Sequence, residues 1–166
     1  MADPFRVAVI TVSDKGSLGL RVDESGPTVC GLVEKAGYAV VGQEIWPDEL
    51  SVLKNRLTEL CDGGQADLIL TTGGTGLSPR DVTPEATLAV ANKIVPGLAE
   101  VMRAESLKKT ARAMLSRAVA VVRGQTLIIN LPGSPKGARE NLEAVLPALE
   151  HGLEILTGRS GDCGRS

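Results

Sequence analysis

Residues 67–85 read DLILTTGGTGLSPRDVTPE, and this stretch decides the fold that the sequence predicts. It opens with a short apolar run, which is typical of a strand buried on both faces of a parallel sheet. The glycines within residues 73–76 can adopt positive φ and let an anion approach the backbone closely. Thr83 is a favoured N-cap and Pro84 suits a first helical turn, so a helix is expected to begin there. The stretch therefore predicts a strand, a glycine-rich bend and a helix, the arrangement in which open α/β sheets bind ligands.

The glycine-rich bend allows two interpretations. Three glycines between a strand and a helix also fit a plain turn that binds nothing. The charged side chains of Arg80 and Asp81 beside the bend favour a ligand site instead. The bend has neither the G-x-G-x-x-G spacing of dinucleotide-binding folds nor the Lys-Ser/Thr pair of a P-loop, so it belongs to neither of these common nucleotide-binding classes.

Strands and helices are expected to alternate on both sides of this stretch. On its N-terminal side, the apolar patterns predict strands over 6–12 and 38–46, a polar turn over 13–17, and helices over 26–37 and 50–60. On its C-terminal side they predict helices over 84–93 and from 96 onwards, a hairpin of strands 118–122 and 126–130, and a last helix from 138. Pro147 should break or kink that last helix.

This alternation predicts an α/β fold class: a three-layer α/β/α, doubly wound architecture with a mostly parallel sheet and a hairpin in the C-terminal half. With 166 residues the chain fits one domain, which we expect over residues 1–157. Residues 158–166 are small and polar and predict a disordered tail. Because 43% of the residues are hydrophobic but only 2% are aromatic, the core must be aliphatic.

Composition and charge argue against several classes of function. The formal net charge of −2 argues against general binding to nucleic acid or to an anionic membrane, and no apolar run is long enough to predict a membrane span. Cys30, Cys61 and Cys163 lie far apart, so they predict neither a zinc site nor a disulfide framework, and a cytoplasmic location is expected. Because His151 is the only histidine, a Ser-His-Asp or Cys-His nucleophile is not expected.

Three carboxylates are expected at one edge of the predicted sheet. Asp14, Asp48 and Asp81 each lie past the end of a predicted parallel strand, and the carboxyl ends of such strands meet at one edge. Carboxylates beside a phosphate-binding bend suggest Mg²⁺, which binds through one or two carboxylates together with phosphate oxygens. Asp48 also fits a simpler role as the N-cap of the helix that follows it.

Four basic residues are candidates for contact with a phosphate: Arg80, Arg117, Lys136 and Arg139. For the last three, a solvated surface position is the simpler interpretation, because most Lys and Arg side chains are exposed. Arg80 differs from them because it lies within the bend itself.

The motifs TTGGTG over residues 71–76 and PRDVTPEAT over residues 79–87 resemble the signature of the Mog/MoaB family of molybdenum-cofactor biosynthesis, which includes the gephyrin G domain. Further motifs follow in the order typical of the family: TVSD over 11–14, PDE over 47–49, AMLSR over 113–117 and LIINLPGSP over 127–135. The resemblance covers nearly the whole chain.

The resemblance implies the function of a molybdopterin adenylyltransferase. In that reaction the terminal phosphate of molybdopterin attacks the α-phosphorus of ATP held with Mg²⁺, giving adenylyl-molybdopterin and pyrophosphate. The family further implies a homotrimer, to which apolar positions in residues 86–102 would contribute contacts. It also implies a partner in the same pathway, the enzyme that inserts molybdate.

The same resemblance implies roles for individual residues. Asp48 and Asp81 would be catalytic and would hold the metal, while the glycine-rich bend would cradle phosphate. The residues implied in binding substrate or nucleotide are Ser13, Asp14, Thr72, Gly73, Gly74, Thr75, Gly76, Ser78, Arg80, Thr83, Glu85, Ser116, Arg117, Pro132, Gly133 and Ser134.

Two alternatives to this enzyme remain open. Relatives of MoaB type depart from the PDE and RDVTPE motifs, and a carrier or scaffold of that kind would bind the pterin without turnover. This chain keeps both motifs, with Asp48 and Asp81 in them, which favours the enzyme. Competence-damage relatives of the fold use another nucleotide pyrophosphate chemistry, but they carry a different loop sequence and usually a further domain.

Overall fold

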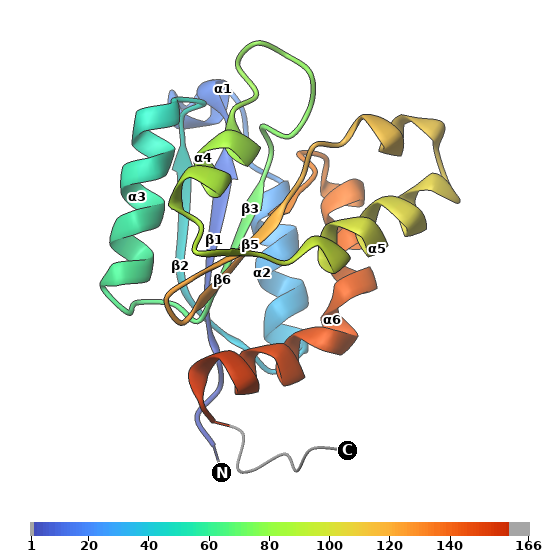
Figure 1. Cartoon of the computed structure of the whole chain (residues 1–166). Coiled ribbons are helices and arrows are strands. Elements are labelled where there is room, and N and C mark those ends of the chain that lie inside the picture. The colour runs from blue at the N-terminus through green and yellow to red at the C-terminus, as the bar shows by residue number, and fades with distance from the viewer. Residues whose placement is uncertain (1, 160–166) are drawn as a thin grey trace.

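The computed structural model describes residues 2–159, and its centre is a six-stranded sheet (Figure 1). The strands are β1 (Arg6–Val12), β2 (Ala39–Trp46), β3 (Leu68–Thr72), β4 (Lys93–Ile94), β5 (Ala120–Arg123) and β6 (Thr126–Leu131). Their spatial order is β2-β1-β3-β6-β5-β4; the first four run parallel, and β5 and β4 are each antiparallel to the strand before them in that order. The mostly parallel sheet with a C-terminal hairpin is therefore confirmed.

Helices cover both faces of the sheet, which confirms the three-layer α/β/α architecture. They are α1 (Asp14–Ser17), α2 (Ser25–Lys35), α3 (Leu50–Asp62), α4 (Thr83–Val90), α5 (Pro96–Leu107), the 3₁₀ helix η1 (Ala111–Leu115) and α6 (Pro135–Thr157). Helices α2, α5 and α6 pack into one apolar cluster, and α3 and α4 pack into another on the opposite face (Figure 1). Within the described residues, no helix has the length and apolar character needed to cross a membrane.

Strand β1 lies inside the sheet because its side chains are almost all apolar. Val7 and Val9 join the cluster formed with α2, α5 and α6, whereas Ala8, Ile10 and Val12 join the cluster formed with α3 and α4. Successive side chains of a strand point to opposite faces, so a strand covered on both faces needs a continuous apolar run.

The strand order places a crevice between β1 and β3. Helix α2 carries the chain from β1 to β2, and α3 returns it over the opposite face of the sheet to β3, on the other side of β1. Such a reversal opens a crevice at the carboxyl ends of the strands. The segments that follow β1, β2, β3 and β6 all reach this edge, over residues 13–24, 47–49, 73–82 and 132–134.

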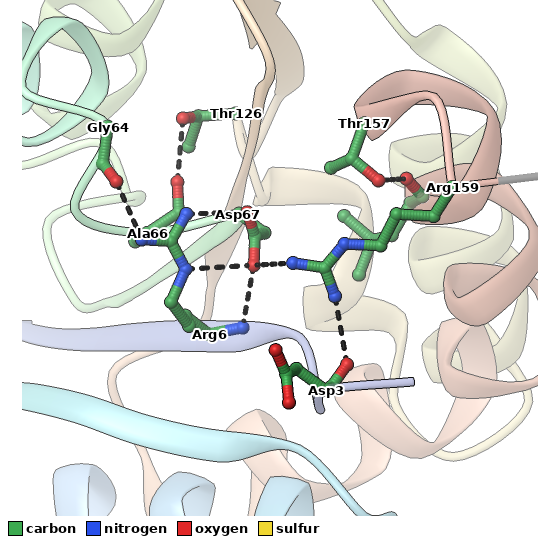
Figure 2. Close-up of polar contacts among 9 residues, drawn as sticks. Asp3, Arg6, Gly64, Ala66, Asp67, Thr126, Thr157 and Arg159 are labelled. Atoms are coloured by element: carbon green, nitrogen blue, oxygen red, sulfur yellow. Dashed lines mark hydrogen bonds and ion pairs between the residues drawn. The ribbon is translucent and has the colours of Figure 1, made fainter. Parts of the chain in front are cut away.

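At the opposite edge of the sheet, a buried carboxylate ties the first strand to a residue that follows the last helix (Figure 2). Asp67 accepts hydrogen bonds from the backbone N–H of Arg6 at 2.8 Å and from its Nη2 at 2.9 Å, and Nη2 of Arg159 lies 3.5 Å away. Arg159 also donates to the carbonyl oxygen of Asp3 at 2.9 Å and lies over the ring of Phe5. Burial by itself raises the pKa of Asp67, but the hydrogen bonds from Arg6 outweigh burial and hold that pKa below its ordinary value.

Two predictions for the C-terminal part can be compared with the structure. The tail was expected to begin at residue 158, but Gly158 caps α6 with positive φ and Arg159 is held by Asp67; the rest of that tail, residues 160–166, lies outside the described residues. Of the two outcomes predicted for Pro147, a break or a kink, the helix shows no break: α6 continues to Thr157, and Figure 1 shows its ribbon changing direction along its length. Proline removes one hydrogen bond and crowds the preceding turn, so a helix held by packing bends there and continues.

Two local elements also differ from the sequence prediction. The turn predicted over residues 13–17 is a one-turn helix, α1, with Ser13 as its N-cap. The helix predicted over residues 84–93 ends at Val90, and Lys93–Ile94 forms β4, which pairs with β5. A strand of two residues has no periodicity of its own, so only its partner in the sheet identifies it.

Candidate active site

The glycine-rich bend lies between β3 and α4 and is held through its backbone. Gly73 and Gly74 have φ values of 100° and 70°, which residues with a side chain rarely adopt. The N–H of Gly73 donates to the carbonyl oxygen of Leu131 at 3.1 Å. The carbonyl oxygens of Gly73 and Gly74 accept bonds from the hydroxyl of Thr83 at 3.0 Å and from its N–H at 3.1 Å. These bonds fix the bend against β6 and the start of α4.

Two details of the bend differ from the prediction. Gly76 does not have positive φ; a side chain there would instead meet Asp81, whose Oδ2 lies 2.9 Å from the position of an added Cβ. Thr83 was expected to be the N-cap of α4, but Val82 occupies that position and the Thr83 hydroxyl binds the bend. Gly76 therefore leaves room for Asp81 within the bend, and the Thr83 hydroxyl makes a contact that a helix-cap pattern does not predict.

A cavity of about 560 Å³ opens where β1, β3 and β6 end. Eight of the predicted site residues line it: Ser13, Asp48, Thr72, Gly73, Gly74, Asp81, Gly133 and Ser134. The segment that leads from β1 into the start of α2 adds Arg21, Val22, Asp23, Glu24 and Ser25 to the wall. Glycine backbone, hydroxyls, four carboxylates and one arginine thus line the same space, and these are groups that bind phosphates and their metal ions.

Asp48 faces this cavity and is held in place by Asp14. Its Oδ2 accepts a hydrogen bond from the N–H of Asp14 at 2.9 Å, and its own N–H donates to Oδ1 of Asp14 at 3.0 Å. The N-cap of α3 is Glu49, without a side-chain bond, so the interpretation of Asp48 as that cap is wrong. Burial raises the pKa of Asp48, and the charges of Asp14 and Asp81 raise it further against the opposing hydrogen bond from Asp14. A nearby cation would stabilise a carboxylate in these surroundings.

Asp81 faces the same cavity from the far end of the bend. Its Oδ2 accepts a hydrogen bond from the N–H of Ser78 at 3.0 Å. Across residues 2–159, no cluster of three or more Asp, Glu, His or Cys side chains is placed to hold a metal ion by itself. The pair Asp48 and Asp81 on one cavity fits instead a Mg²⁺ that is bound together with phosphate oxygens and water. Asp48 and Asp81 are the residues that could hold it.

Arg80, the predicted cation of the bend, is paired with acidic side chains. Its Nε and Nη2 each donate to a carboxylate oxygen of Asp14 at 3.0 Å, and Nη2 lies 3.3 Å from Oε1 of Glu49. The bonds from Arg80 hold the pKa of Asp14 below its ordinary value. Because 55% of the Arg80 side chain is exposed, this pair contributes little to stability and can open for an anionic ligand.

Arg117 binds the backbone of the bend. Its Nε donates to the carbonyl oxygen of Gly76 at 2.8 Å, and its Nη2 donates to that of Asp81 at 2.8 Å. Its Nη1 forms an ion pair with Glu85, and this hydrogen bond holds the pKa of Glu85 below its ordinary value. The guanidinium group therefore contacts the outside of the bend at two points.

A second cavity, of about 310 Å³, adjoins the first, because Ser134 lines both. Four more of the predicted residues line it: Thr75, Gly76, Ser116 and Pro132. Other parts of its wall come from α5, η1 and α6, with Arg103, Arg112 and Asn141 among them. Two adjoining cavities, each with polar residues in its wall, are an arrangement suited to a reaction between two substrates.

Six predicted residues line neither cavity in the described part of the chain: Asp14, Ser78, Arg80, Thr83, Glu85 and Arg117. Two of them bind a residue that lines the first cavity: Asp14 binds Asp48, and Ser78 binds Asp81. The candidate cations Lys136 and Arg139 are exposed on α6 and line neither of these two cavities.

The segment over residues 18–24 was not predicted to be part of the site. Arg21 lies on the wall of the first cavity. Asp23 is fixed there by the hydroxyl of Thr11 at 2.7 Å and by the N–H of Gly26 at 3.0 Å. The position of this segment in the sequence could have indicated its role. It follows the carboxyl end of β1, just as the glycine-rich bend follows the carboxyl end of β3.

The described cysteines do not provide a nucleophile. Cys30 and Cys61 are buried, and burial raises the pKa of both thiols, that of Cys61 to about 11. A thiol that stays protonated at neutral pH is a packing residue, as predicted. Cys163 lies outside the described residues.

Comparisons with known proteins agree with one another. Residues 8–151 match the family described as "Probable molybdopterin binding domain". A molybdopterin adenylyltransferase of Helicobacter pylori (strain J99) is 42% identical over 156 residues, covering 93% of this chain and 89% of that protein. One from Escherichia coli (strain K12) is 43% identical over 146 residues, covering 87% and 75%. The solved structure of a molybdopterin biosynthesis enzyme MoaB from Thermus thermophilus is 54% identical, with a TM-score of 0.88, and covers 93% of this chain and 97% of that one.

Proposed function

This chain belongs to the family of the probable molybdopterin binding domain, and we propose that it is a molybdopterin adenylyltransferase of molybdenum-cofactor biosynthesis. Its membership confirms the resemblance to the Mog/MoaB proteins, and relatives that carry the name of this enzyme support the activity. The observation that carries the proposal is the position of Asp48 and Asp81, which face one cavity beside a glycine-rich bend. A protein that only binds a pterin has no evident need for two carboxylates there.

In the proposed reaction, an oxygen of the terminal phosphate of molybdopterin forms a bond to the α-phosphorus of ATP. The bond from that phosphorus to the bridging oxygen breaks, and pyrophosphate leaves. Charge spreads over the oxygens of the transferring group, so the site acts mainly through position and electrostatics. Bound Mg²⁺ would supply neutralisation of the phosphate charge, and Asp48 and Asp81 would hold it.

The two cavities have separate roles in this proposal. We assign the first to ATP, because it contains the proposed metal ligands Asp48 and Asp81 and the cation Arg21. Glycine is needed at position 74, since a Cβ there would lie 2.2 Å from Oγ1 of Thr83 and 3.2 Å from Oδ1 of Asp48. The second cavity takes the pterin, whose ring offers several hydrogen-bonding groups to the polar residues of its wall, such as Arg103 and Asn141. The reacting phosphates would then meet near Ser134, which lines both cavities.

We also propose that the enzyme is a cytoplasmic homotrimer that delivers its product to the molybdate-inserting enzyme. Exposed apolar side chains between α4 and the end of α5 support the assembly, namely Leu88, Ile94, Val101 and Leu107. A closed cyclic assembly would bury such positions symmetrically. Light scattering should report the mass of three chains, and a monomer would contradict this assignment. The unpaired, buried Cys30 and Cys61 are consistent with a reducing compartment.

Pyrophosphate release from ATP and Mg²⁺, measured with and without molybdopterin, tests the activity. We expect release only when molybdopterin is present. Dephosphorylated molybdopterin is the matched control: it lacks the nucleophile and the charge-assisted hydrogen bonds of its phosphate, so it should bind more weakly and never be adenylylated. Pterin binding without pyrophosphate release would identify a carrier or scaffold instead of the enzyme.

A further inference from the structure

Arg117 joins both ends of an exposed segment of the glycine-rich bend to the sheet. It lies just before β5, which is antiparallel to β6, so the start of β5 reaches the edge where the parallel strands end. Its side chain binds the carbonyl oxygens of Gly76 and Asp81, each at 2.8 Å. Its backbone N–H adds a bond to the carbonyl oxygen of Thr75 at 3.0 Å. One residue therefore contacts the backbone on both sides of residues 77–80.

Residues 77–80 have few other attachments. All four are exposed, and the hydrogen bonds between Ser78 and Asp81 lie within the bend, so they shape it without attaching it to the sheet. The contact of Arg80 with Asp14 does reach another element, but both side chains are substantially exposed and such pairs contribute little to stability. The position of Asp81 therefore depends largely on Arg117 and on the start of α4.

Every nitrogen of the Arg117 guanidinium group takes part in a contact. Glu85, in the first turn of α4, pairs with Nη1, so each of the three guanidinium nitrogens has a partner. Arg117 lines neither of the two cavities. A guanidinium group bound in this way is suited to hold a backbone segment.

We propose that Arg117 is a positioning residue, which holds the bend so that the carboxylate of Asp81 faces the cavity together with Asp48. The catalytic consequence rests on the proposed function, whereas the effect on the bend does not. Arginine is required because its planar fork reaches two carbonyl oxygens and a carboxylate at once, while lysine offers a single compact ammonium group. Arg117→Lys therefore keeps the charge opposite Glu85 and loses the fork.

Arg123 offers a matched control in the same strand region. Its guanidinium also combines a carboxylate, that of Asp62 at 2.9 and 3.0 Å, with a backbone carbonyl, that of Val90 at 3.0 Å. It lies at the far end of β5 and lines neither cavity. Arg123→Lys removes the same kind of contact without touching the bend.

Hydrogen exchange in the ligand-free protein and the kinetics of adenylyl transfer together test the role of Arg117. In Arg117→Lys, the amides of residues 74–81 should exchange about tenfold faster, because each lost hydrogen bond weakens the closed state severalfold. The turnover number should fall about 100-fold with little change in KM for ATP, as for a misplaced catalytic group. Arg123→Lys should keep wild-type values for both.

Wild-type exchange over residues 74–81 in a folded Arg117→Lys protein would overturn the proposal. A raised KM with wild-type turnover would also overturn it, because that result indicates direct contact with the nucleotide. If Arg117→Lys does not fold, Glu85→Gln is the second variant, because it keeps both bonds from Arg117 to carbonyl oxygens. It should raise the exchange rate of the amides of residues 74–81 by a smaller factor. An unchanged exchange rate would count against the proposal. Absence of pyrophosphate release by the wild-type protein would refute the proposed function and leave the exchange result in place.

Discussion

Asp14 and Asp48 exchange two hydrogen bonds between the segments that follow β1 and β2. The N–H of Asp14 donates to Oδ2 of Asp48 at 2.9 Å, and the N–H of Asp48 donates to Oδ1 of Asp14 at 3.0 Å. Asp14 also accepts two hydrogen bonds from Arg80 in the glycine-rich bend. One carboxylate outside the cavity thus connects the exits of β1, β2 and β3 and orients the carboxylate of Asp48.

Asp48→Asn should abolish adenylyl transfer with little loss of stability. The amide oxygen of asparagine can still accept the bond from Asp14, whereas the charge that faces the cavity is removed. We expect turnover to fall at least about 100-fold, the effect of removing one electrostatic group from a site. The melting temperature should stay within about 3 °C of wild type. A large fall in melting temperature with unchanged specific activity would show that Asp48 is structural.

Asp81→Ala should also leave the fold intact and remove the activity. The carboxylate accepts a bond from the exposed Ser78 and makes no contribution to either apolar cluster of the described chain. Asp62→Ala is the control, since it removes an exposed carboxylate that pairs with Arg123 far from the cavities. Steady-state turnover should be lost in the first variant and retained in the second. A folded, fully active Asp81→Ala protein would remove Asp81 from the proposed machinery.

Arg21→Ala should weaken the binding of ATP. Among the described residues, Arg21 is the one Lys or Arg that lines the first cavity, because Arg80 and Arg117 are engaged elsewhere. Loss of a hydrogen bond to a charged group should raise KM for ATP about tenfold with a smaller change in turnover. Arg139→Ala removes an exposed arginine on α6 and should change neither value. An unaltered KM in Arg21→Ala would mean that the phosphates contact another part of the wall.

The stability of the fold should depend on pH through Asp67. Its pKa is lower in the folded protein than in the unfolded chain, so unfolding takes up a proton when the pH lies between the two values. The stability that Asp67 contributes is therefore present above its ordinary pKa and is lost as pH falls through the folded value. Asp67→Asn should lower the free energy of unfolding by about 2 kcal/mol at neutral pH, less than for a fully buried pair because Arg6 is partly exposed.

Thermal unfolding over a range of pH checks this dependence. The difference between Asp67→Asn and wild type should shrink in acid, because the protonated aspartic acid then resembles asparagine. Asp62→Asn is the control for an exposed Arg–Asp pair and should change the melting temperature little. A difference that stays constant at every pH would show that the pairing with Arg6 does not depend on the charge of Asp67.

The layered fold and the edge that carries the site were predictable because their signals are local. Continuous apolar runs identified β1 and β3 as strands buried on both faces, and the glycines at 73 and 74 with Pro84 marked the bend and the helix that follows. Alternation of strands and helices then implied a parallel sheet, whose carboxyl ends share one edge. The short strand β4 was missed because two residues acquire strand character only from their partner.

The contacts within that edge were decided by the tertiary structure. From the sequence, Asp48 could be read as a helix cap, Arg80 as a cation for phosphate, and Arg117 as a ligand-binding or surface cation. In the fold, each of these side chains binds a group that the sequence did not identify. These partners are distant in the sequence: Asp48 and Asp14 are 34 residues apart, Arg80 and Asp14 are 66 apart, and Arg117 and Gly76 are 41 apart. Any arginine can satisfy any carboxylate or carbonyl oxygen that it reaches, so such pairings leave no periodic pattern in a sequence. Only the register of the sheet and the packing of its helices determine which of these groups come within hydrogen-bonding distance, and which are left facing the cavity.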